Sequence, residues 1–426
     1  MLEDRFTRRK FLGSAGAALV AAPFVARHSF LGADAPSERI GLGFIGMGTQ
    51  NRGHLGWFLG QSDCQVLAVS DVDTTRREHA KRTVEERYSK DAAYKGCAAY
   101  ADFRELIARK DIDAVVIATP DHWHAIPIVE AAKAKKDIYC EKPLTLTIVE
   151  AKLCIDAVRK HGVVFQTGSQ QRSDREFRMA CELVRSGRIG RLKTVYANVG
   201  GPSRWCDLPE EPLEPGLDWN FWLGPAPSRP YHSELSPRGV HTHFPNWRAY
   251  REYSGGGMTD WGAHHFDIAQ WGIGADESGP VEVIPPEGKE ARGVRWVYEN
   301  GVELVHGGPR GVLFVGTDGE INVDRGWIQS KPPEILKAPL GEKDVRLYKS
   351  PGHQRDWLAC IRERRRAICD VEVGARSVTV CHLGNIAYWE RKKLRWDPKA
   401  WKLLGDDAPT KLLDRERRDP WQLPAL

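Results

Sequence analysis

The stretch from Ile40 to Asn51 constrains the fold of this chain more than any other. It begins as a short apolar run, Ile40–Ile45, turns at glycines, and leads into Arg52–Leu59, which can start a helix. A strand, a glycine turn and a helix in this order are typical of a dinucleotide-binding unit. Because a helix N-terminus carries unpaired N–H groups and a positive dipole end, we expect the turn to hold a pyrophosphate.

Four residues of this turn are candidates for contact with the cofactor. Gly46 would form the tight turn, and Gly48 would let the backbone approach the pyrophosphate, with Thr49 next to it. The third position of the usual fingerprint holds Asn51 instead of Gly or Ala. This departure leaves the packing of the helix on the strand open at Asn51.

A carboxylate lies at the spacing expected for the second half of the fingerprint. The apolar run Gln65–Ser70 predicts a second buried strand, and Asp71 ends it. We expect Asp71 to bond a ribose hydroxyl and to repel a 2′-phosphate, which favours NAD over NADP. The alternative is that Asp71 caps a helix that starts at Thr74. Arg76 and Arg77 follow closely and could take a phosphate, so NADP stays open.

The composition excludes several classes of protein. The length of 426 residues favours two domains. The formal charge of +5 is spread along the chain, and no basic run with interleaved aromatic residues suggests a nucleic-acid partner. Nine cysteines form no C-x-x-C pair, which argues against a metal cluster and a disulfide framework.

Residues 1–35 are predicted to be a twin-arginine signal peptide. Thr7–Leu12 has the twin-arginine pattern, and the Ala- and Gly-rich run Phe11–Val25 that follows is too short and too weakly apolar for a stable membrane anchor. Ala33–Ala35 offers a cleavage site. We expect the twin-arginine machinery to export the protein to the periplasm already folded, with tightly bound NAD. A chance Arg-Arg pair before an apolar segment is the alternative.

Residues 36–170 predict a doubly wound parallel sheet, the Rossmann fold, because strand and helix patterns alternate. After the glycine unit these are Thr74–Ser89, Ala114–Ala118, Trp123–Lys135, Asp137–Cys140, Ile148–His161 and Val163–Gln166. Loops at the carboxyl ends of such strands face the ligand. Two of these loops carry Thr119, Pro120 and His124, and Glu141 and Lys142.

Residues 171–426 predict a second α/β domain with an open, mainly antiparallel sheet. Its short strands are expected at Leu192–Val199 and between 281 and 324, and a helix at Met258–Trp271. Two helices between His353 and Arg391 are expected to pack back, and the tail from Arg395 to wrap the surface.

Residues 200–257 form a long insertion rich in Trp, Pro and His. A loop of this length in a domain is usually functional, and tryptophan faces can stack on sugar rings. The alternative is that these aromatic residues cover the core or a subunit interface. The substrate candidates are Trp205, Trp219, Trp222, Tyr231, His241, His243 and Trp247, with Arg172 and His265 outside the insertion.

Three residues suggest one chemistry. Lys142 could stabilise developing alkoxide character on a substrate oxygen. Asp260 and His264 are four residues apart and would share one helix face, where the carboxylate could make the imidazole a better general base. Half of a metal site is the alternative for this pair, but no further ligands are evident, so no metal is predicted. His264 could also be a core histidine.

The sequence resembles the Gfo/Idh/MocA (glucose–fructose oxidoreductase/inositol dehydrogenase) superfamily over the whole mature chain. The motifs are the glycine turn, the E-K-P tripeptide Glu141–Pro143 and the G-G-G-x-x-x-D-x-G-x-H-x-x-D pattern Gly255–Asp267. The resemblance implies a Rossmann domain and an open-sheet domain that often forms an oligomer interface. It places Lys142, Asp260 and His264 at catalytic positions, and Thr119, Pro120, His124, Glu141 and Lys142 beside the cofactor.

This resemblance implies an NAD(P)-dependent oxidoreductase that acts on a carbinol of a sugar, glycoside or cyclitol. His264 would take the hydroxyl proton, Asp260 would orient His264, and Lys142 would polarise the oxygen. Two alternatives stay open. One is an NAD-dependent glycosidase or lyase that oxidises its substrate transiently, with Tyr231, His241 or His243 as a further acid/base. The other is a non-catalytic sugar-binding protein.

Overall fold

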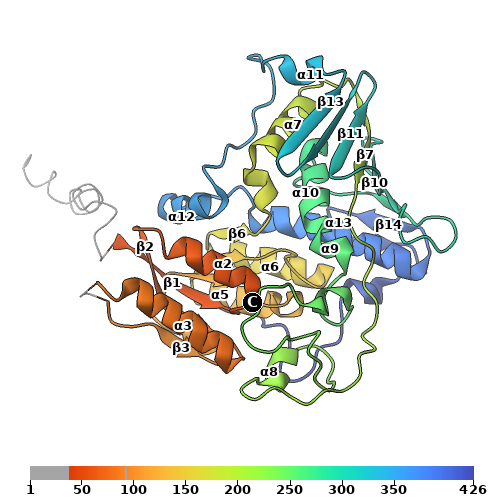
Figure 1. Ribbon diagram of the computed structural model, residues 1–426. Helices are drawn as coiled ribbons and strands as arrows, with labels where there is room; N and C mark the ends of the chain where they lie inside the picture. The colour runs from red at the N-terminus through yellow and green to blue at the C-terminus, as the bar shows by residue number, and fades with distance from the viewer. Residues whose placement is uncertain (1–37, 92–93) are drawn as a thin grey trace, which may run out of the picture.

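Two sheets organise the chain in the computed structural model, which describes residues 38–91 and 94–426 (Figure 1). The first sheet has six strands in the order β3-β2-β1-β4-β5-β6, all parallel. The second has nine strands in the order β13-β12-β11-β7-β10-β9-β8-β14-β15, and only β7 and β10 pair in parallel among its described pairs. The predicted export segment, residues 1–35, lies outside the described residues.

The N-terminal domain alternates strands and helices, and its central strands are buried at every position because helices cover both faces. In register, Leu42 of the first strand pairs with Val66 on one side and Ala114 on the other. The elements are β1 (Ile40–Ile45), α2 (Thr49–Phe58), β2 (Cys64–Ser70), α3 (Thr74–Tyr88), β3 (Ala98–Tyr100), α4 (Phe103–Ile107), β4 (Ala114–Ile117), α5 (Ala125–Lys133), β5 (Asp137–Cys140), α6 (Ile148–His161) and β6 (Phe165–Thr167).

The second domain is a helix-backed open sheet. Its elements are α7 (Arg175–Arg185), β7 (Leu192–Ala197), α8 (Trp219–Leu223), α9 (Gly257–Asp260), α10 (Gly262–Ile273), β8 (Glu282–Ile284), β9 (Arg295–Val297), β10 (Glu303–His306), β11 (Val312–Gly316), β12 (Glu320–Asp324), β13 (Trp327–Lys331), α11 (Glu334–Lys337), α12 (His353–Glu363), α13 (Val371–Glu390), β14 (Leu394–Asp397) and β15 (Lys402–Leu404). The predicted fold class, a Rossmann domain followed by a mainly antiparallel α/β domain, is confirmed.

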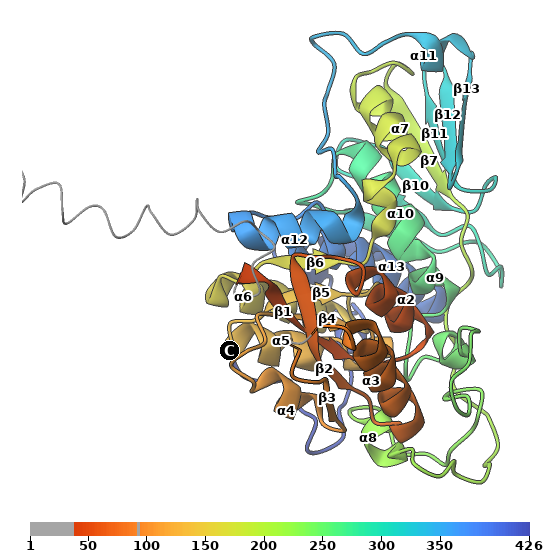
Figure 2. The same ribbon diagram turned by 60° about the vertical axis from the view of Figure 1, so that its left-hand side comes forward.

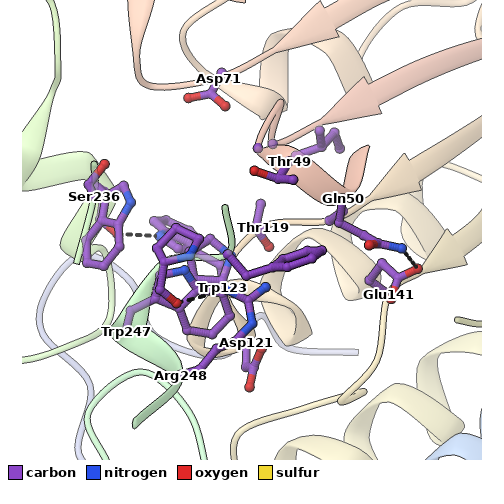
Figure 3. Close-up of a pocket in the computed structure, with 18 of the residues that line it drawn as sticks. Thr49, Gln50, Asp71, Thr119, Asp121, Trp123, Glu141, Ser236, Trp247 and Arg248 are labelled. Atoms are coloured by element: carbon purple, nitrogen blue, oxygen red, sulfur yellow. Dashed lines mark hydrogen bonds between the residues drawn. The ribbon is translucent and has the colours of Figure 1, made fainter. Parts of the chain in front are cut away.

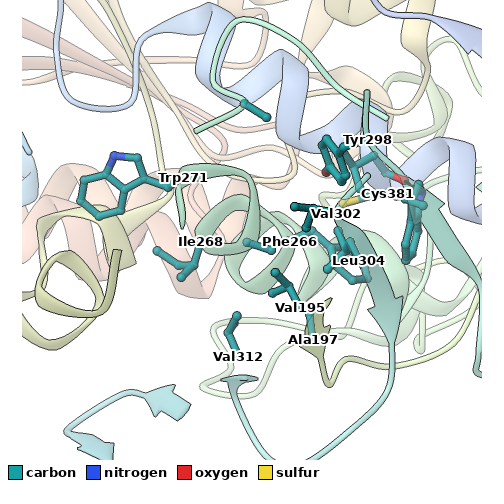
Figure 4. Packing of buried hydrophobic residues seen from close by; sticks show 14 of the residues in the cluster. Val195, Ala197, Phe266, Ile268, Trp271, Tyr298, Val302, Leu304, Val312 and Cys381 are labelled. Atoms are coloured by element: carbon teal, nitrogen blue, oxygen red, sulfur yellow. Dashed lines mark hydrogen bonds between the residues drawn. The ribbon is translucent and has the colours of Figure 1, made fainter. Parts of the chain in front are cut away.

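The core of the second domain lies between its sheet and α10. Every residue of α10 from Gly262 to Gly272 is buried. Figure 4 shows Phe266 of this helix on the side of Val195, Leu304 and other apolar side chains of the strands. The element that carries His264 is therefore held by packing on all sides, which gives its side chain a defined position.

The last two long helices join the domains. Trp357 of α12 packs in the Rossmann core beside Phe58 and Tyr139. The first turns of α13 pack in the Rossmann core through Val371 and Ala375, and its later turns join the core of the second domain. Figures 1 and 2 show α13 between the two sheets. The prediction that these helices pack back agrees with this arrangement.

Two of the differences from the sequence-based expectation lie in the second domain. The helix predicted over Met258–Trp271 is interrupted at Trp261, because the N–H of His264 bonds the carbonyl of Trp261, three residues back, where an α-helix bonds four residues back. The tail from Arg395 partly forms β14 and β15, which extend the sheet edge. No helix among the described residues is long and apolar enough to cross a membrane.

Candidate active site

A cavity of about 500 Å³ opens along the carboxyl ends of the Rossmann strands. It is bounded by the loops that follow β1, β2, β4 and β5, and by the insertion and α9–α10 from the second domain. Figure 3 shows Trp247 and Arg248 on one side of this space, and Gln50 and Glu141 on the other. Ligands of open α/β sheets bind at this edge, so the cavity is the candidate active site.

The glycine turn has the geometry that a dinucleotide needs. Gly46 has φ +79°, and a Cβ there would lie 3.0 Å from the backbone of Ala118 and Thr119. Gly48 is the N-cap of α2 without a side-chain cap, and a Cβ there would meet nothing within 4 Å. The space above the helix N-terminus is therefore free for a pyrophosphate, and its N–H groups can receive one.

Asn51 ties the turn to the sheet. Its side chain is fully buried, and its Nδ2 donates to the carbonyls of Gly46 at 2.8 Å, Ile45 at 3.2 Å and Val116 at 3.4 Å. A small residue at this position brings helix and strand together by its size. Here hydrogen bonds hold the two elements together, which answers the question that the sequence left open.

Asp71 is bonded to the glycine turn and caps no helix. Its carboxylate accepts from the N–H of Met47 at 2.6 Å and of Asp73 at 2.8 Å. The cap of α3 is Asp73, which accepts from the N–H groups of Thr75 and Arg76. Burial raises the pKa of Asp71, and Arg76 and the two N–H groups oppose that rise. The capping alternative is therefore wrong, and Asp71 lines the cavity beside the turn.

Glu141 is a buried carboxylate that accepts hydrogen bonds from several side chains. Its Oε1 lies 2.7 Å from Nε2 of His54, and it accepts from Gln170 at 2.8 Å and Gln50 at 3.1 Å. Burial acts to raise the pKa of Glu141, but the hydrogen bond and charge of His54, aided by the charge of Lys142, lower it to about 2. Glu141 therefore stays ionised and gives the cavity floor a permanent negative charge.

Lys142 and Asp260 form an ion pair between the two domains. The Nζ of Lys142 lies 2.6 Å from Oδ1 of Asp260 and donates to its carbonyl at 3.0 Å. Burial acts to raise the pKa of Asp260, but Lys142 and then Arg248 outweigh it and lower that pKa. An ammonium group has three donors, so Lys142 keeps one for a substrate oxygen.

His264 lines the same cavity without the partner that we expected. In the described residues, Asp260 bonds Lys142 and makes no hydrogen bond to His264, whose Nδ1 is buried without a partner. The interruption at Trp261 removes the regular helical relation between positions 260 and 264. Burial, with the charges of Lys142 and Arg325, lowers the pKa of His264 well below its ordinary value. The imidazole is therefore neutral near pH 7 and can accept a proton.

Comparison with known proteins identifies the family. Residues 40–169 match the model of an oxidoreductase family NAD-binding Rossmann fold, and residues 203–423 match that of an oxidoreductase family C-terminal alpha/beta domain. The second match alone covers more than half of the chain. The chain belongs to the Gfo/Idh/MocA oxidoreductase family.

Similar members of this family differ in activity. The chain is 33% identical over 150 residues to the myo-inositol 2-dehydrogenase of Thermotoga maritima, across 35% of this chain and 42% of that protein. It is 30% identical over 179 residues to the alpha-N-acetylgalactosaminidase of Shewanella oneidensis, across 42% of this chain and 39% of that protein. The chain thus matches less than half of the length of either relative.

A solved structure supports the same fold. The WlbA dehydrogenase from Bordetella pertussis, in complex with NADH and UDP-GlcNAcA, has a TM-score of 0.59 and 17% identity, covering 84% of this chain and 99% of that one. The Gfo/Idh/MocA arrangement of a Rossmann domain and an open sheet is thus shared over nearly the whole length of that enzyme.

A segment of the insertion crosses the glycine turn of the Rossmann domain. We call residues 235–248 the strap. Thr49 at the start of α2 donates to the strap carbonyls of His243 at 2.9 Å and His241 at 3.3 Å, and Arg52 of the same helix also donates to His241. Seven strap residues and the N-terminus of α2 line one cavity, so the strap covers the expected pyrophosphate site.

Two arginines that could have taken a 2′-phosphate are already engaged. Arg76 is buried and donates to the strap at Pro237, Gly239 and Ser236. Arg77 donates to the backbone carbonyl of Asp71 at 2.7 Å. Both guanidinium groups thus serve the protein's own structure.

The remaining candidates on the cofactor side lie in one loop. Thr119 and Pro120 line the cavity. The ring nitrogens of His124 each lie 2.9 Å from a carbonyl, one of Thr119 and one of Pro143. His124 thus ties the loops after β4 and β5 together and lies behind the cavity wall.

Arg172 and His265 do not line the cavity. Arg172 is buried in ion pairs with Asp267 and Asp276, each at 2.8 Å. The last aspartate of the G-G-G motif, Asp267, thus holds α10 to the segment before α7. Nδ1 of His265 lies 3.2 Å from the carbonyl of Asn198.

Most aromatic residues of the insertion form a small core of their own. Trp219 stacks on Trp222 with the ring centres 4.7 Å apart, and the hydroxyl of Tyr231 donates to the carbonyl of Ser236. Trp205 is 62% exposed, lies outside the cavity and packs against the half-buried guanidinium of Arg251. Of the insertion candidates, the cavity is lined by Trp222, His241 and Trp247; His243 contributes its carbonyl to the strap contact.

Sequence reasoning missed several lining residues. Trp261 and Arg248 directly follow Asp260 and Trp247, so attention to sequence neighbours could have found them. Arg325 follows strand β12 and carries no local signal that places it beside His264. In the described ranges, no cluster of three or more His, Cys, Asp or Glu side chains could hold a metal ion.

Proposed function

We propose that the protein is an NAD-dependent oxidoreductase that acts on a carbinol of a sugar, a glycoside or a cyclitol. The observation that carries this proposal is that one cavity joins the glycine turn and Asp71 to Lys142, Asp260 and His264. The inositol dehydrogenase relative supports this class of substrate. A non-catalytic sugar-binding protein would not need a desolvated base beside a paired lysine.

The proposed reaction uses three side chains of this chain. A nicotinamide, when bound, supplies the hydride acceptor. His264, neutral at pH 7, takes the proton of the substrate hydroxyl, and the free donor of Lys142 stabilises the negative charge that develops on that oxygen. The carboxylate of Asp260 holds the Lys142 ammonium at 2.6 Å. Because it is engaged in that ion pair and makes no hydrogen bond to His264 among the described residues, we assign it no role in orienting the imidazole.

NAD is the proposed cofactor in preference to NADP. The carboxylate of Asp71 lines the cavity beside the glycine turn, where it would bond a ribose hydroxyl and repel a 2′-phosphate. The two nearby arginines are bonded to the strap and to backbone. The dissociation constant of NADP should therefore be much larger than that of NAD, and Asp71→Ser should reduce the ratio of the two constants. An unchanged ratio would show that Asp71 has no part in this selection.

We also propose that NAD stays bound during purification, because the strap covers the turn. The protein purified after overexpression is heated, and the released ligand is identified by mass. It is then incubated with free sugars, glycosides and cyclitols while reduced nicotinamide is followed by absorbance. Loss of the signal in His264→Asn with NAD still bound assigns the chemistry to this cavity. A protein that releases no dinucleotide contradicts the proposal.

A redox-neutral glycosidase is the second candidate. The alpha-N-acetylgalactosaminidase relative supports it, and a covered, recycled cofactor suits a reaction that returns to its starting redox state. The two candidates differ in product. A dehydrogenase accumulates a ketone or lactone and reduced cofactor, whereas a glycosidase releases a free sugar and leaves the cofactor oxidised.

We propose twin-arginine export to the periplasm, because a protein loaded with NAD in the cytoplasm must be exported folded. Replacing Arg8 and Arg9 by Lys should leave the protein in the cytoplasmic fraction. We further propose a homo-oligomer. Tyr196, Val305 and Leu313 pair across neighbouring strands on the sheet face opposite α10 and are half-buried, which suits a subunit interface. Light scattering of the purified protein tests this.

A further inference from the structure

Three cations line the end of the cavity that holds the proposed base. They are Lys142, Arg248 and Arg325. Lys142 and Arg248 approach the same oxygen of Asp260, at 2.6 Å and 3.6 Å. One carboxylate thus serves two cations, and Arg325 has no share in it.

Arg248 is held in place by aromatic rings. Its guanidinium carbon lies 4.2 Å from the ring centre of Trp247 and 5.0 Å from that of Phe244. Its Nη1 donates to the carbonyl of Pro245. The strap therefore fixes Arg248 against Asp260, where it serves the ion pair with Lys142.

Arg325 has a different environment. It lies in the turn after β12, its side chain lines the cavity, and its guanidinium carbon is 4.8 Å from the ring of Trp261. Among the described residues it forms no ion pair. The nearest acid in the sequence, Asp324, is taken by Arg310 and by the N–H of Arg325 itself. The amide oxygen of Gln171, in the orientation that satisfies its own bonds, accepts from Nε of Arg325 at 3.2 Å.

The carboxylates at this end of the cavity already have partners. Asp260 pairs with Lys142 and Arg248, Glu141 is bonded by His54 and two glutamines, and Asp121 accepts a hydrogen bond from Ser254. One guanidinium is therefore left facing the cavity without a carboxylate. A planar guanidinium binds a carboxylate through two parallel hydrogen bonds, and the bond is strengthened where protein walls exclude water.

We propose that Arg325 is the specificity residue for an anionic substrate, and that the substrate is a sugar acid whose carboxylate binds this guanidinium. Trp261, 42% exposed beside Arg325, offers an apolar face to the sugar ring. This inference rests on the proposed function, because it names the class of sugar that would reach His264.

The test compares matched acidic and neutral sugars. Binding of D-glucuronate and D-glucose, and of D-galacturonate and D-galactose, to the NAD-loaded protein is measured by titration calorimetry. In at least one pair the acid should bind about tenfold more tightly, the scale of one charge-assisted contact. Arg325→Gln should abolish this preference. Arg295→Gln is the matched control, because Arg295 is an exposed arginine of the same domain, pairs with Glu303 and does not line the cavity. Melting temperature and bound NAD show that both variants are folded.

Each outcome decides the inference. Absence of acid preference in both pairs, or a preference that survives Arg325→Gln, overturns it. If neutral sugars reduce the bound NAD and acids have no advantage, the oxidoreductase proposal stands and the acidic substrate falls. If the acids bind through Arg325 and no tested sugar reduces the NAD, the anion site stands and the proposed oxidation falls.

Discussion

Asn51 holds a helix against its strand by hydrogen bonds at a position where the usual fingerprint has a small residue. The dinucleotide fingerprint places a small residue where a helix meets its strand. Here a buried amide donates to three carbonyls of β1, the turn and β4. The hydrogen bonds hold the turn in the conformation that exposes the N–H groups of α2.

We predict that Asn51→Ala lowers the free energy of unfolding by about 1–3 kcal/mol, because buried carbonyls lose their donor. NAD affinity should fall as well. Chemical denaturation and NAD titration measure the two effects. Asn51→Asp is the sharper comparison, since it keeps the shape and cannot donate; if it is as stable as the wild type, the hydrogen bonds are not what holds the turn.

At the reacting end, we predict that His264→Asn lowers turnover by roughly 10²–10⁴-fold, the usual effect of removing a positioned base. Lys142→Met should cause a comparable loss through the charge on the reacting oxygen. The fold loss of turnover in the double variant should be smaller than the product of the two single losses, because both residues act on one proton transfer. Bound NAD is measured on the same samples. A folded, NAD-loaded His264→Asn enzyme with normal turnover contradicts the mechanism.

At the scale of elements, the insertion divides into two parts with different roles. Residues around α8 form an aromatic core, and the strap closes over the start of α2. The anchors of the strap are side chains of the Rossmann domain, namely Thr49, Arg52 and Arg76. The strap is therefore held in place by contacts between the two domains.

We predict that Arg52→Ala speeds the loss of NAD about tenfold, because one charge-assisted hydrogen bond to the strap is removed. Arg52 does not line the cavity, and its other hydrogen bond is to the carbonyl of Met47 in the glycine turn. The rate is followed by the fluorescence of bound NADH after dilution. Arg87→Ala is the control, since Arg87 also donates to a backbone carbonyl of the Rossmann domain, at Leu59. Equal rates in the two variants would rule out the strap as the barrier.

At the scale of the whole molecule, α12 begins where the two domains meet. Nε2 of His353 lies 2.9 Å from the carbonyl of Thr167, and Nδ1 lies 2.8 Å from Oγ of Ser173. Burial lowers the pKa of His353 to about 4 against an ordinary 6.5. Between these values the unfolded chain binds a proton that the folded protein does not, so stability falls as pH drops below 6.5.

We predict that His353→Gln reduces this acid sensitivity. At pH 5 the single histidine accounts for about 2 kcal/mol, since one pKa unit is worth about 1.4 kcal/mol. Melting temperatures of both proteins are compared from pH 7 to pH 5, and the contributions of groups that both proteins share, such as Glu141, cancel in this comparison. Parallel curves would show that His353 does not contribute.

Local signals in the sequence determined the parallel sheet. The apolar runs at 40–45, 65–70 and 114–118, the glycine turn and the helix periods depend on neighbouring residues, because backbone preferences and burial patterns act over a few positions. The same signals identified Lys142 and His264 as residues of one site through their motifs. Short elements such as β3 and α4 were missed, because three to five residues carry too little periodicity.

Only the tertiary structure decided which side chains meet. Lys142 and Asp260 pair across 118 positions, and Thr49 reaches the strap carbonyl of His243 across 194. The expected contact of Asp260 with His264 needed an unbroken helix, and the turn at Trp261 prevents it. Arg325 meets the cavity because the turn after β12 lies beside Trp261, at the start of α10. Such contacts follow from the packing of whole elements, which no local pattern in the sequence encodes.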